Sequence, residues 1–182
     1  FVDLATNAAG WLNEGLASFF EGTRILSNGT VIMNLPATGR LFALVPRMQR
    51  GFMDDVKDGI DPNDVTKDPP KSPTFRIVLE DEYEWGPPWY APTWGVVFFL
   101  YNYQDPADGR FLYRKSFWDF VDASGGLSGA TAIAKFEELV LANPEPVTPG
   151  VQSTIALPKT VDQLNEVWKN YILKLGGQQS GS

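Results

Sequence analysis

The stretch that decides the fold is "YAPTWGVVFFLYNYQ", residues 90–104. It is apolar nearly all round a helix, and it includes Trp94, Val97, Phe98 and Tyr101. A helix without a polar face has to be covered by other elements, because apolar surface is expelled from water. We therefore predict a buried helix over about 91–104, inside a core that other segments complete.

The segments on either side of this helix are mostly helical in pattern. Apolar residues recur at helical spacing over 9–21, 39–57, 110–122 and 128–142. A last helix opens with Thr160-x-x-Gln163, a capping-box pattern. Two Pro-rich loops, over 58–73 and 143–158, interrupt the series, and residues 74–85 fit either a strand or a short helix.

One short part of the chain has a β pattern. "RILSNGTVIMN", residues 24–34, predicts a hairpin with strands at 24–27 and 30–33, because Asn28-Gly29 favours a two-residue type I′ turn. The tail "GGQQSGS" has nothing to bury. We predict a mainly α fold: a single helical domain over 1–176 with one small β-hairpin, followed by a disordered tail over 177–182.

Composition excludes several classes of function. The net charge of −7 argues against a nucleic-acid partner, which would need clustered Lys and Arg. No apolar run approaches the roughly 18 residues of a membrane span. The 182 residues include no Cys and no His, so a Ser-His-Asp triad, a Cys-His pair and an imidazole or thiolate metal site cannot come from this chain alone.

Glu14 is the unusual residue of the first predicted helix. It stands in "GWLNEGLASFFEG", residues 10–22, beside Leu12 and Gly15, with no basic residue until Arg24. A carboxylate on an apolar helix has to be hydrogen-bonded, ion-paired or metal-bound if it is buried. The alternative is that Glu14 lies at the helix edge and reaches water.

The segment "WLNEGLASFFEG" resembles the one that follows the HExxH helix in gluzincin-type zinc metallopeptidases, and more narrowly the peptidase MA-like group of bacterial proteins. The match at Trp11–Ala17 is its specific part, and it implies that Glu14 is the third zinc ligand. Looser similarities follow at 90–100, at Phe136-Glu137-Glu138 and from Leu164 to Tyr171. The resemblance implies a fold similar to the C-terminal subdomain of a zincin, zinc as cofactor, a peptide or protein substrate, and an extracytoplasmic or secreted bacterial location.

The chain departs from the family pattern in one respect: without His it has no HExxH motif. Either an upstream HExxH-bearing segment precedes Phe1 in the parent protein, or the chain belongs to a member that has lost its metal. We expect no zinc on this chain alone, since one carboxylate does not make a site. In related enzymes a Tyr often stabilises the developing oxyanion, and Tyr90 is the candidate for that catalytic role; aromatic packing of Tyr90 is the alternative.

A second candidate region is "EDEYEWGPPWYAPTW", residues 80–94. In a peptidase, Trp85, Trp89 and Trp94 would bind substrate along the cleft. The expected function is the C-terminal portion of a zinc-dependent peptidase, supplying the third zinc ligand and a cleft wall. Three alternatives stay open: a non-catalytic binding or scaffold domain that uses the aromatic patch 85–94 for glycan or protein contact, a glycosidase-like pair among Glu80, Glu82 and Glu84, and a solvated acidic turn that leads into an aromatic core helix.

Overall fold

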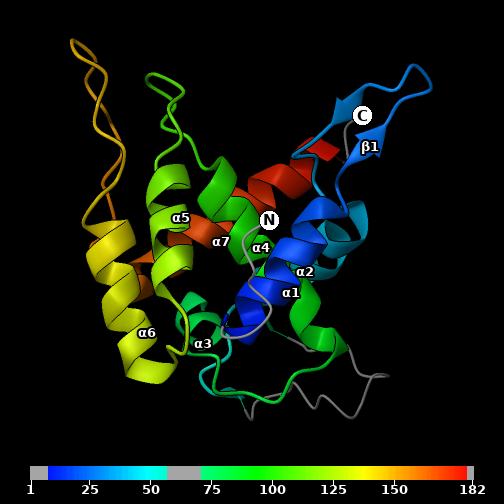
Figure 1. Ribbon diagram of the computed structural model, residues 1–182, viewed down its shortest axis with the longest axis vertical. Helices are drawn as coiled ribbons and strands as arrows, with labels where there is room; N and C mark the ends of the chain where they lie inside the picture. Colours follow the sequence, from blue (N-terminus) through cyan, green and yellow to red (C-terminus); the bar gives the residue numbers. More distant parts are fainter. Residues whose placement is uncertain (1–7, 57–70, 180–182) are drawn as a thin grey trace.

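The computed structural model describes residues 8–56 and 71–179, and over these residues the chain is mainly helical (Figure 1). The elements follow in the order α1 (Gly10–Phe20), β1 (Arg24–Ile25), β2 (Val31–Ile32), α2 (Thr38–Arg50), α3 (Phe75–Glu80), η2 (Pro87–Trp89), α4 (Tyr90–Asn102), α5 (Arg114–Ala123), α6 (Gly129–Phe136), η3 (Glu137–Leu141) and α7 (Val161–Gln179). The predicted fold class, a mainly α fold with one small β-hairpin, is confirmed.

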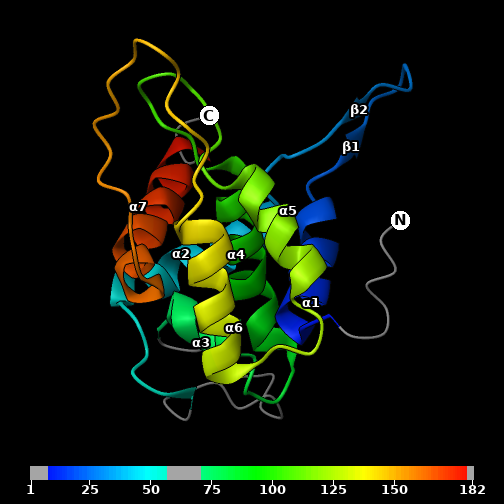
Figure 2. The ribbon, with the colours of Figure 1, turned by 60° about the vertical axis from the view of Figure 1, so that its left-hand side comes forward.

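Helix α4 is the centre of the fold. Every residue from Ala91 to Leu100 is buried, and α1, α2, α5 and α7 all pack against it (Figures 1 and 2). Gly95 is the point of closest approach, where an added Cβ would meet the side chains of Leu44 on α2 and Trp168 on α7. The buried helix predicted over 91–104 is therefore confirmed, with its end two residues earlier.

The core around α4 is rich in aromatic rings that meet edge to face. Phe75 of α3 lies between Trp168 and Phe99, with ring centroids 5.4 and 6.1 Å away and interplanar angles of 86° and 78°. Phe136 of α6 packs on Phe75 as well, at 5.8 Å. Such geometry places the positive ring edge on the negative ring face, and it adds to the burial energy of each ring. The short helix α3 thereby joins α4, α6 and α7.

The ambiguous segment 74–85 forms a helix only at its start. Thr74 caps α3, because its hydroxyl accepts a hydrogen bond from the N–H of Ile77 at 3.1 Å. The helix ends at Asp81, whose backbone is left-handed with φ of 54°. Helix α2 ends at Gly51, with φ of 100°, so the helix predicted over 39–57 is too long at its C-terminal end. Most of the loop predicted over 58–73 lies outside the described residues.

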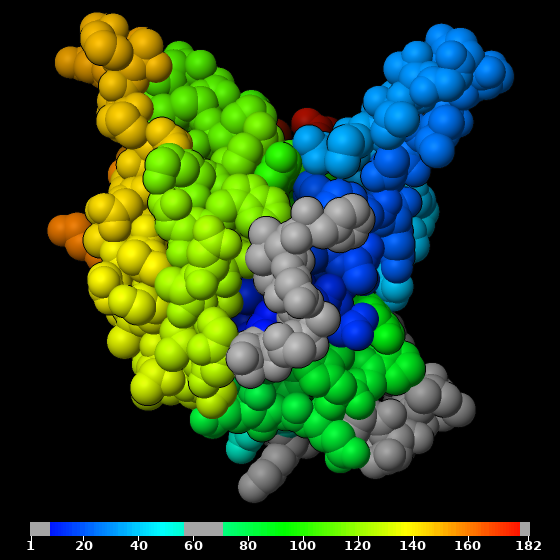
Figure 3. Space-filling view, in the orientation of Figure 1, coloured from blue at the N-terminus to red at the C-terminus, as the bar shows by residue number. Residues whose placement is uncertain are grey.

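The hairpin is confirmed, but its turn differs from the prediction. Arg24 pairs with Ile32 and Ile25 with Val31. The N–H of Leu26 donates to the carbonyl of Thr30 at 2.8 Å, which leaves a three-residue loop. Of that loop only Gly29 has a positive φ, of 82°, as in a type I turn followed by a left-handed glycine. The hairpin projects from the helical body (Figure 3).

The C-terminal part shows two local departures. Helix α6 continues into η3, a π-helical turn. At the start of α7, Thr160 accepts from the N–H of Gln163 at 3.4 Å, but the Gln163 side chain accepts from Lys159 rather than from Thr160, so the capping box is shifted by one residue. Helix α7 runs to Gln179, three residues into the tail predicted over 177–182, and 180–182 lie outside the described residues.

The length and polarity of the helices bear on membranes. Within 8–56 and 71–179, no helix combines the length and the apolar character that crossing a bilayer requires. This agrees with the absence of a long apolar run in the sequence.

Candidate functional site

Glu14 lies at the edge of the buried face of α1. Its neighbours one turn away on the buried side, Trp11 and Ser18, are 0% and 2% exposed, whereas Ala17 on the other side is exposed. Glu14 itself is half-buried. The carboxylate is therefore neither in the core nor on a fully solvated face. It lies at the helix edge, as one alternative from the sequence had it, but it is also partly buried, as the other required.

A row of contacts follows the same side of α1. Residues four and seven positions apart share one side of an α-helix, so Gly10, Glu14 and Glu21 form a stripe. At one end the indole of Trp85 lies directly against Gly10. At the other end the guanidinium of Arg40 binds Glu21 through two hydrogen bonds of 2.6 and 2.9 Å.

Tyr90 connects the two ends of this row. Its ring centroid lies 6.3 Å from that of Trp85, and the guanidinium of Arg40 lies 4.8 Å above the ring. A cation over an aromatic face is attracted by the ring quadrupole, which helps to hold Tyr90 in place. The structure therefore brings Tyr90 and Trp85 to the side of α1 that carries Glu14. We call Glu14, Trp85, Tyr90, Arg40 and Glu21 the α1 stripe cluster.

The two carboxylates of this cluster have different electrostatic environments. Glu21 is paired with Arg40, with the Arg40 Nη2 and Glu21 Oε1 atoms 2.6 Å apart. Glu14 makes no side-chain hydrogen bond or ion pair with any of the described residues. Partial burial of a carboxylate without a donor or cation is unfavourable. Glu14 is thus the member of the cluster whose charge is not compensated by the described part of the chain.

The glycine next to Glu14, Gly15, is required by the close packing of α1 on α4. A Cβ at this position would come within 2.7 Å of a Val97 methyl group and 2.9 Å of the Thr93 carbonyl oxygen. The lack of a side chain lets α1 lie directly on the backbone of α4. This close contact fixes the position of α1, and with it the position of the stripe, relative to Tyr90 at the start of α4.

Asp81 fixes the start of α1 from 70 residues away in the sequence. Its carboxylate accepts hydrogen bonds from the N–H groups of Gly10 and Trp11, at 2.6 and 3.2 Å. Ala9, the residue before the helix, supplies no side-chain cap. Burial raises the pKa of Asp81 above its ordinary value, although the two N–H groups act in the opposite direction.

Two of the three predicted substrate-binding tryptophans are core residues. Trp89 and Trp94 are both 0% exposed. Trp89 stacks on Tyr83 with ring centroids 3.4 Å apart and an interplanar angle of 9°, and Trp94 packs on Phe98 at 5.0 Å. Neither indole has a face open to a ligand, because each is enclosed by its packing partners. Trp85, which is half-buried, is the one of the three that can touch a substrate.

The three predicted carboxylates of the acidic turn border one cavity but differ in exposure and pairing. Glu80 pairs with Arg76 at 3.7 Å, while Glu82 and Glu84 are exposed. All three line an acidic cavity of about 610 Å³. The glycosidase-like role of these carboxylates stays a prediction.

The described residues do not build a metal site by themselves. Within 8–56 and 71–179, no group of three or more His, Cys, Asp or Glu side chains is arranged to hold a metal ion. A zinc ion bound through Glu14 would therefore need its other ligands from elsewhere.

Comparison with known proteins identifies no relative of this chain. No protein-family model, no curated protein and no solved structure matches the chain. The resemblance to gluzincins therefore stays a prediction that rests on the motif at 11–17. The arrangement around Glu14 is the structural observation that bears on function.

Proposed function

We propose that this chain is the C-terminal portion of a zinc-dependent peptidase, in which Glu14 is the third zinc ligand and Trp85 and Tyr90 form part of one wall of the substrate cleft. The observation that carries the proposal is the state of Glu14: a half-buried carboxylate without a hydrogen-bond or ion-pair partner among the described residues. A cation beside it would offset the cost of its partial burial.

The donor chemistry of Glu14 fits zinc in part. Catalytic zinc is bound by three protein ligands, with carboxylate oxygens among the accepted types, and it supplies an activated water in its open position. This chain offers Glu14 alone. The remaining two ligands and the general base would come from an HExxH-bearing segment upstream of Phe1 in the parent protein, which also makes that segment the first partner of this chain.

The residues around Glu14 hold its helix in place and do not pair with its carboxylate. Arg40 is bound by Glu21, so the nearby cation is already neutralised by another carboxylate. Gly15 and Asp81 hold α1 against α4 and fix its start. A ligand helix held at several points keeps its carboxylate in one position, as a metal site requires.

Tyr90 has the properties of a group that contacts the substrate. Its ring is held between Trp85 and Arg40, and its hydroxyl makes no hydrogen bond with the described residues. In the proposed enzyme this hydroxyl donates a hydrogen bond to the oxyanion that develops on the scissile carbonyl. Trp85 contributes apolar surface to the same wall.

Peptidase activity of the parent protein tests the proposal. The protein is produced from its gene with the region upstream of Phe1 included, and the hydrolysis of a quenched fluorescent peptide library is followed with and without a chelator. We expect chelator-sensitive cleavage that falls at least about 100-fold in Glu14→Gln, because the metal is lost or misplaced.

Glu21→Gln is the matched control, since Glu21 shares the helix and the stripe but is ion-paired and exposed. It should retain activity within about threefold, as expected for a surface pair of small energetic weight. Cleavage that is unaffected by Glu14→Gln, or equally reduced by both substitutions, would contradict the proposal. Tyr90→Phe should lower kcat by about 10- to 1000-fold with little change in KM, because it removes one oxyanion donor.

A further inference from the structure

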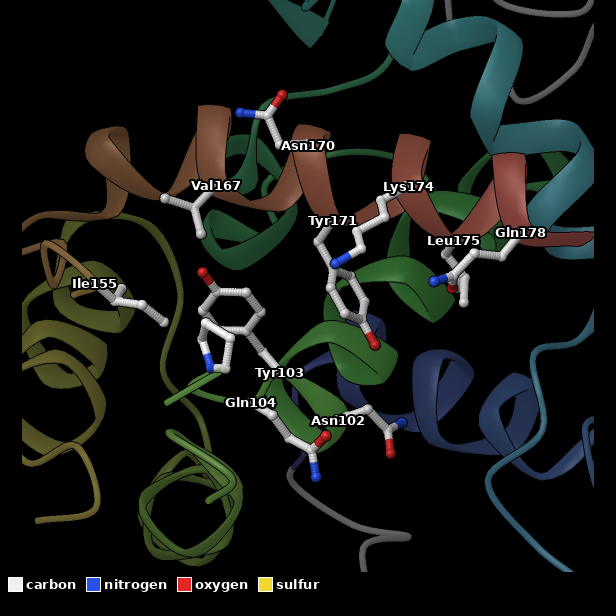
Figure 4. A pocket seen from close by; sticks show the side chains of 11 residues that line it. Asn102, Tyr103, Gln104, Ile155, Val167, Asn170, Tyr171, Lys174, Leu175 and Gln178 are labelled. Atoms are coloured by element: carbon white, nitrogen blue, oxygen red, sulfur yellow. The ribbon is translucent and has the colours of Figure 1, made fainter. Parts of the chain in front are cut away.

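A second cavity lies apart from the α1 stripe cluster. It has a volume of about 580 Å³, is open to solvent on one side, and lies between the end of α4, the loop that follows it, Ile155 of the loop before α7, and α7 itself (Figure 4). This volume is in the range of small-molecule sites. None of the residues that line it belongs to the α1 stripe cluster.

Two tyrosine rings supply the aromatic part of its apolar surface, and four aliphatic side chains line the rest: Pro106, Ile155, Val167 and Leu175. Tyr103 and Tyr171 meet edge to face, with ring centroids 5.7 Å apart and an interplanar angle of 89°. Both rings also pack on Phe99, at 4.8 and 5.5 Å, which fixes their orientation. The two rings come from different elements, Tyr103 from the loop after α4 and Tyr171 from α7 (Figure 4).

The tyrosine hydroxyls are neutral hydrogen-bonding groups. Burial raises the pKa of Tyr171, and burial together with the nearby charge of Asp105 raises that of Tyr103. Both hydroxyls therefore stay protonated at neutral pH, and each can donate one hydrogen bond and accept others.

Side-chain amides supply the other polar groups of the lining. Asn102, Gln104, Asn170 and Gln178 all border the cavity. Asn102 donates to the carbonyl of Phe98 at 3.2 Å, whereas Gln104 and Gln178 make no side-chain hydrogen bond with the described residues. Amides both donate and accept, as the tyrosine hydroxyls do, and this is also the character of an alcohol hydroxyl.

One of the described residues that line the cavity is charged, and its charge is positive. Lys174 of α7 lines it, and its ammonium group pairs with no carboxylate of the described residues. Among residues 8–56 and 71–179 no Asp or Glu lines the cavity, although the protein has a net charge of −7. Lys174 therefore offers a local partner for an anionic group of a ligand, while Asp105 lies behind Tyr103 and is paired with Arg110.

We propose that this cavity binds a small acidic sugar of the hexuronic acid class, with its carboxylate at Lys174, its hydroxyls on the amides and tyrosine hydroxyls, and one face of its ring against the tyrosine pair. The ligand class follows from the lining: rigid aromatic faces, several groups that both donate and accept, and one cation that has no carboxylate partner among the described residues. The site is independent of the proposed peptidase function and requires no metal.

The test uses the 182-residue chain and three probes: glucuronate, glucose and acetate. Binding is followed by changes in the NMR spectrum of the protein. We expect saturable glucuronate binding with a Kd of about 1 mM, and glucose binding at least about tenfold weaker because it lacks the carboxylate. Acetate, which has the charge without the hydroxyls or the ring, should neither bind measurably nor displace glucuronate.

Variants separate the contributions. Lys174→Gln should reduce glucuronate affinity to that of glucose, and Tyr171→Phe, which keeps the ring, should weaken both sugars by about 3- to 10-fold through loss of a hydrogen bond. Lys159→Gln is the control, because Lys159 is exposed and does not line the cavity. The absence of saturation by about 100 mM glucuronate, equal affinity for glucose and glucuronate, or displacement by acetate at similar concentration would each overturn the proposal.

Discussion

Gly15 is the residue on which the position of Glu14 depends most directly. A Cβ there would approach the Thr93 carbonyl oxygen to 2.9 Å, and that backbone atom cannot move without shifting α4. We expect Gly15→Ala to lower the free energy of unfolding by about 1–2 kcal/mol, because overpacking outweighs the better helix propensity of Ala. Urea denaturation followed by circular dichroism measures this change.

Gly39→Ala is the matched control for that substitution. Gly39 is also helical, but a Cβ there would meet nothing within 4 Å. Here the propensity term acts alone, so the variant should be as stable as the original chain or up to about 1 kcal/mol more stable. A Gly15→Ala protein that gained stability like Gly39→Ala would show that α1 does not lie on α4 as described.

Asp81 tests the long-range cap of α1. Removing the acceptor of the Gly10 and Trp11 N–H groups in Asp81→Ala should cost about 0.5–2 kcal/mol of unfolding free energy. Asp81→Asn should cost less, since Asn keeps one acceptor and tolerates the left-handed backbone at this position. Asp122→Ala, an exposed change on α5, should stay within about 0.5 kcal/mol and serves as reference. Equal effects of the Asp81→Ala and Asp122→Ala changes would argue against the cap.

At the scale of elements, two loops are joined by a buried ionic cluster. Arg110 pairs with Asp105 at 2.9 Å and with Asp108 at 2.7 Å, and the N–H of Thr148 donates to Asp108 at 3.2 Å. Hydrogen bonds from Ser153 and Ala107 lower the pKa of Asp105. Burial acts to raise the pKa of Asp108, but hydrogen bonds from Thr148 and Arg110 outweigh it and hold that pKa below its ordinary value.

The cluster predicts a pH dependence with a definite sign. Both folded-state pKa values lie below the ordinary value of 3.8, so the stabilisation is complete above that value and is lost as the pH falls through the folded-state values. The amide of Thr148 reports this directly in an NMR titration from pH 7 to 2: its signal should stay constant down to pH 3.8 and change only below that value, with the change still incomplete at pH 2. A midpoint at or above 3.8 would contradict the assignment.

The elements that the sequence predicted best are those with strong local signals. The apolar run around Val97 and the Thr160 cap mark the positions of α4 and α7 well. The end of α2 was missed because Gly51 stops the helix while apolar residues continue at Phe52 and Val56. The hairpin was found, but a two-residue turn was predicted where Leu26 and Thr30 close a three-residue loop.

The candidate site was predictable only where its signal was local. Glu14 stood out because a lone carboxylate beside Gly15 is unusual in a helix. The contributions of Asp81 and Arg40 were missed, since both depend on contacts between residues 19 to 71 positions apart. Trp89 and Trp94 are named as substrate-binding candidates with core packing as the alternative, because sequence alone does not distinguish a ring that stacks on substrate from one that stacks on Tyr83 or Phe98.

At the scale of the whole molecule, the helical core provides the stability, and the projecting hairpin contributes little to it. The core is built by helices around α4, whereas the hairpin carries Ile25 and Val31 at 75% and 53% exposure. We expect the double change Ile25→Thr and Val31→Thr to alter the free energy of unfolding by less than about 1 kcal/mol. Leu44→Ala, which empties a fully buried position, should cost about 2–5 kcal/mol. Similar losses in the two proteins would show that the hairpin packs against the body in solution.

The zinc content of the parent protein tests the central claim most directly. The protein produced with the region upstream of Phe1 is purified without added metal, dialysed against zinc, freed of excess and analysed for metal per chain, together with its Glu14→Gln and Glu21→Gln variants. We predict one zinc per chain in the parent and in Glu21→Gln, and strongly weakened or lost zinc in Glu14→Gln. No zinc in the parent, or zinc held equally by all three proteins, would show that Glu14 is not a zinc ligand.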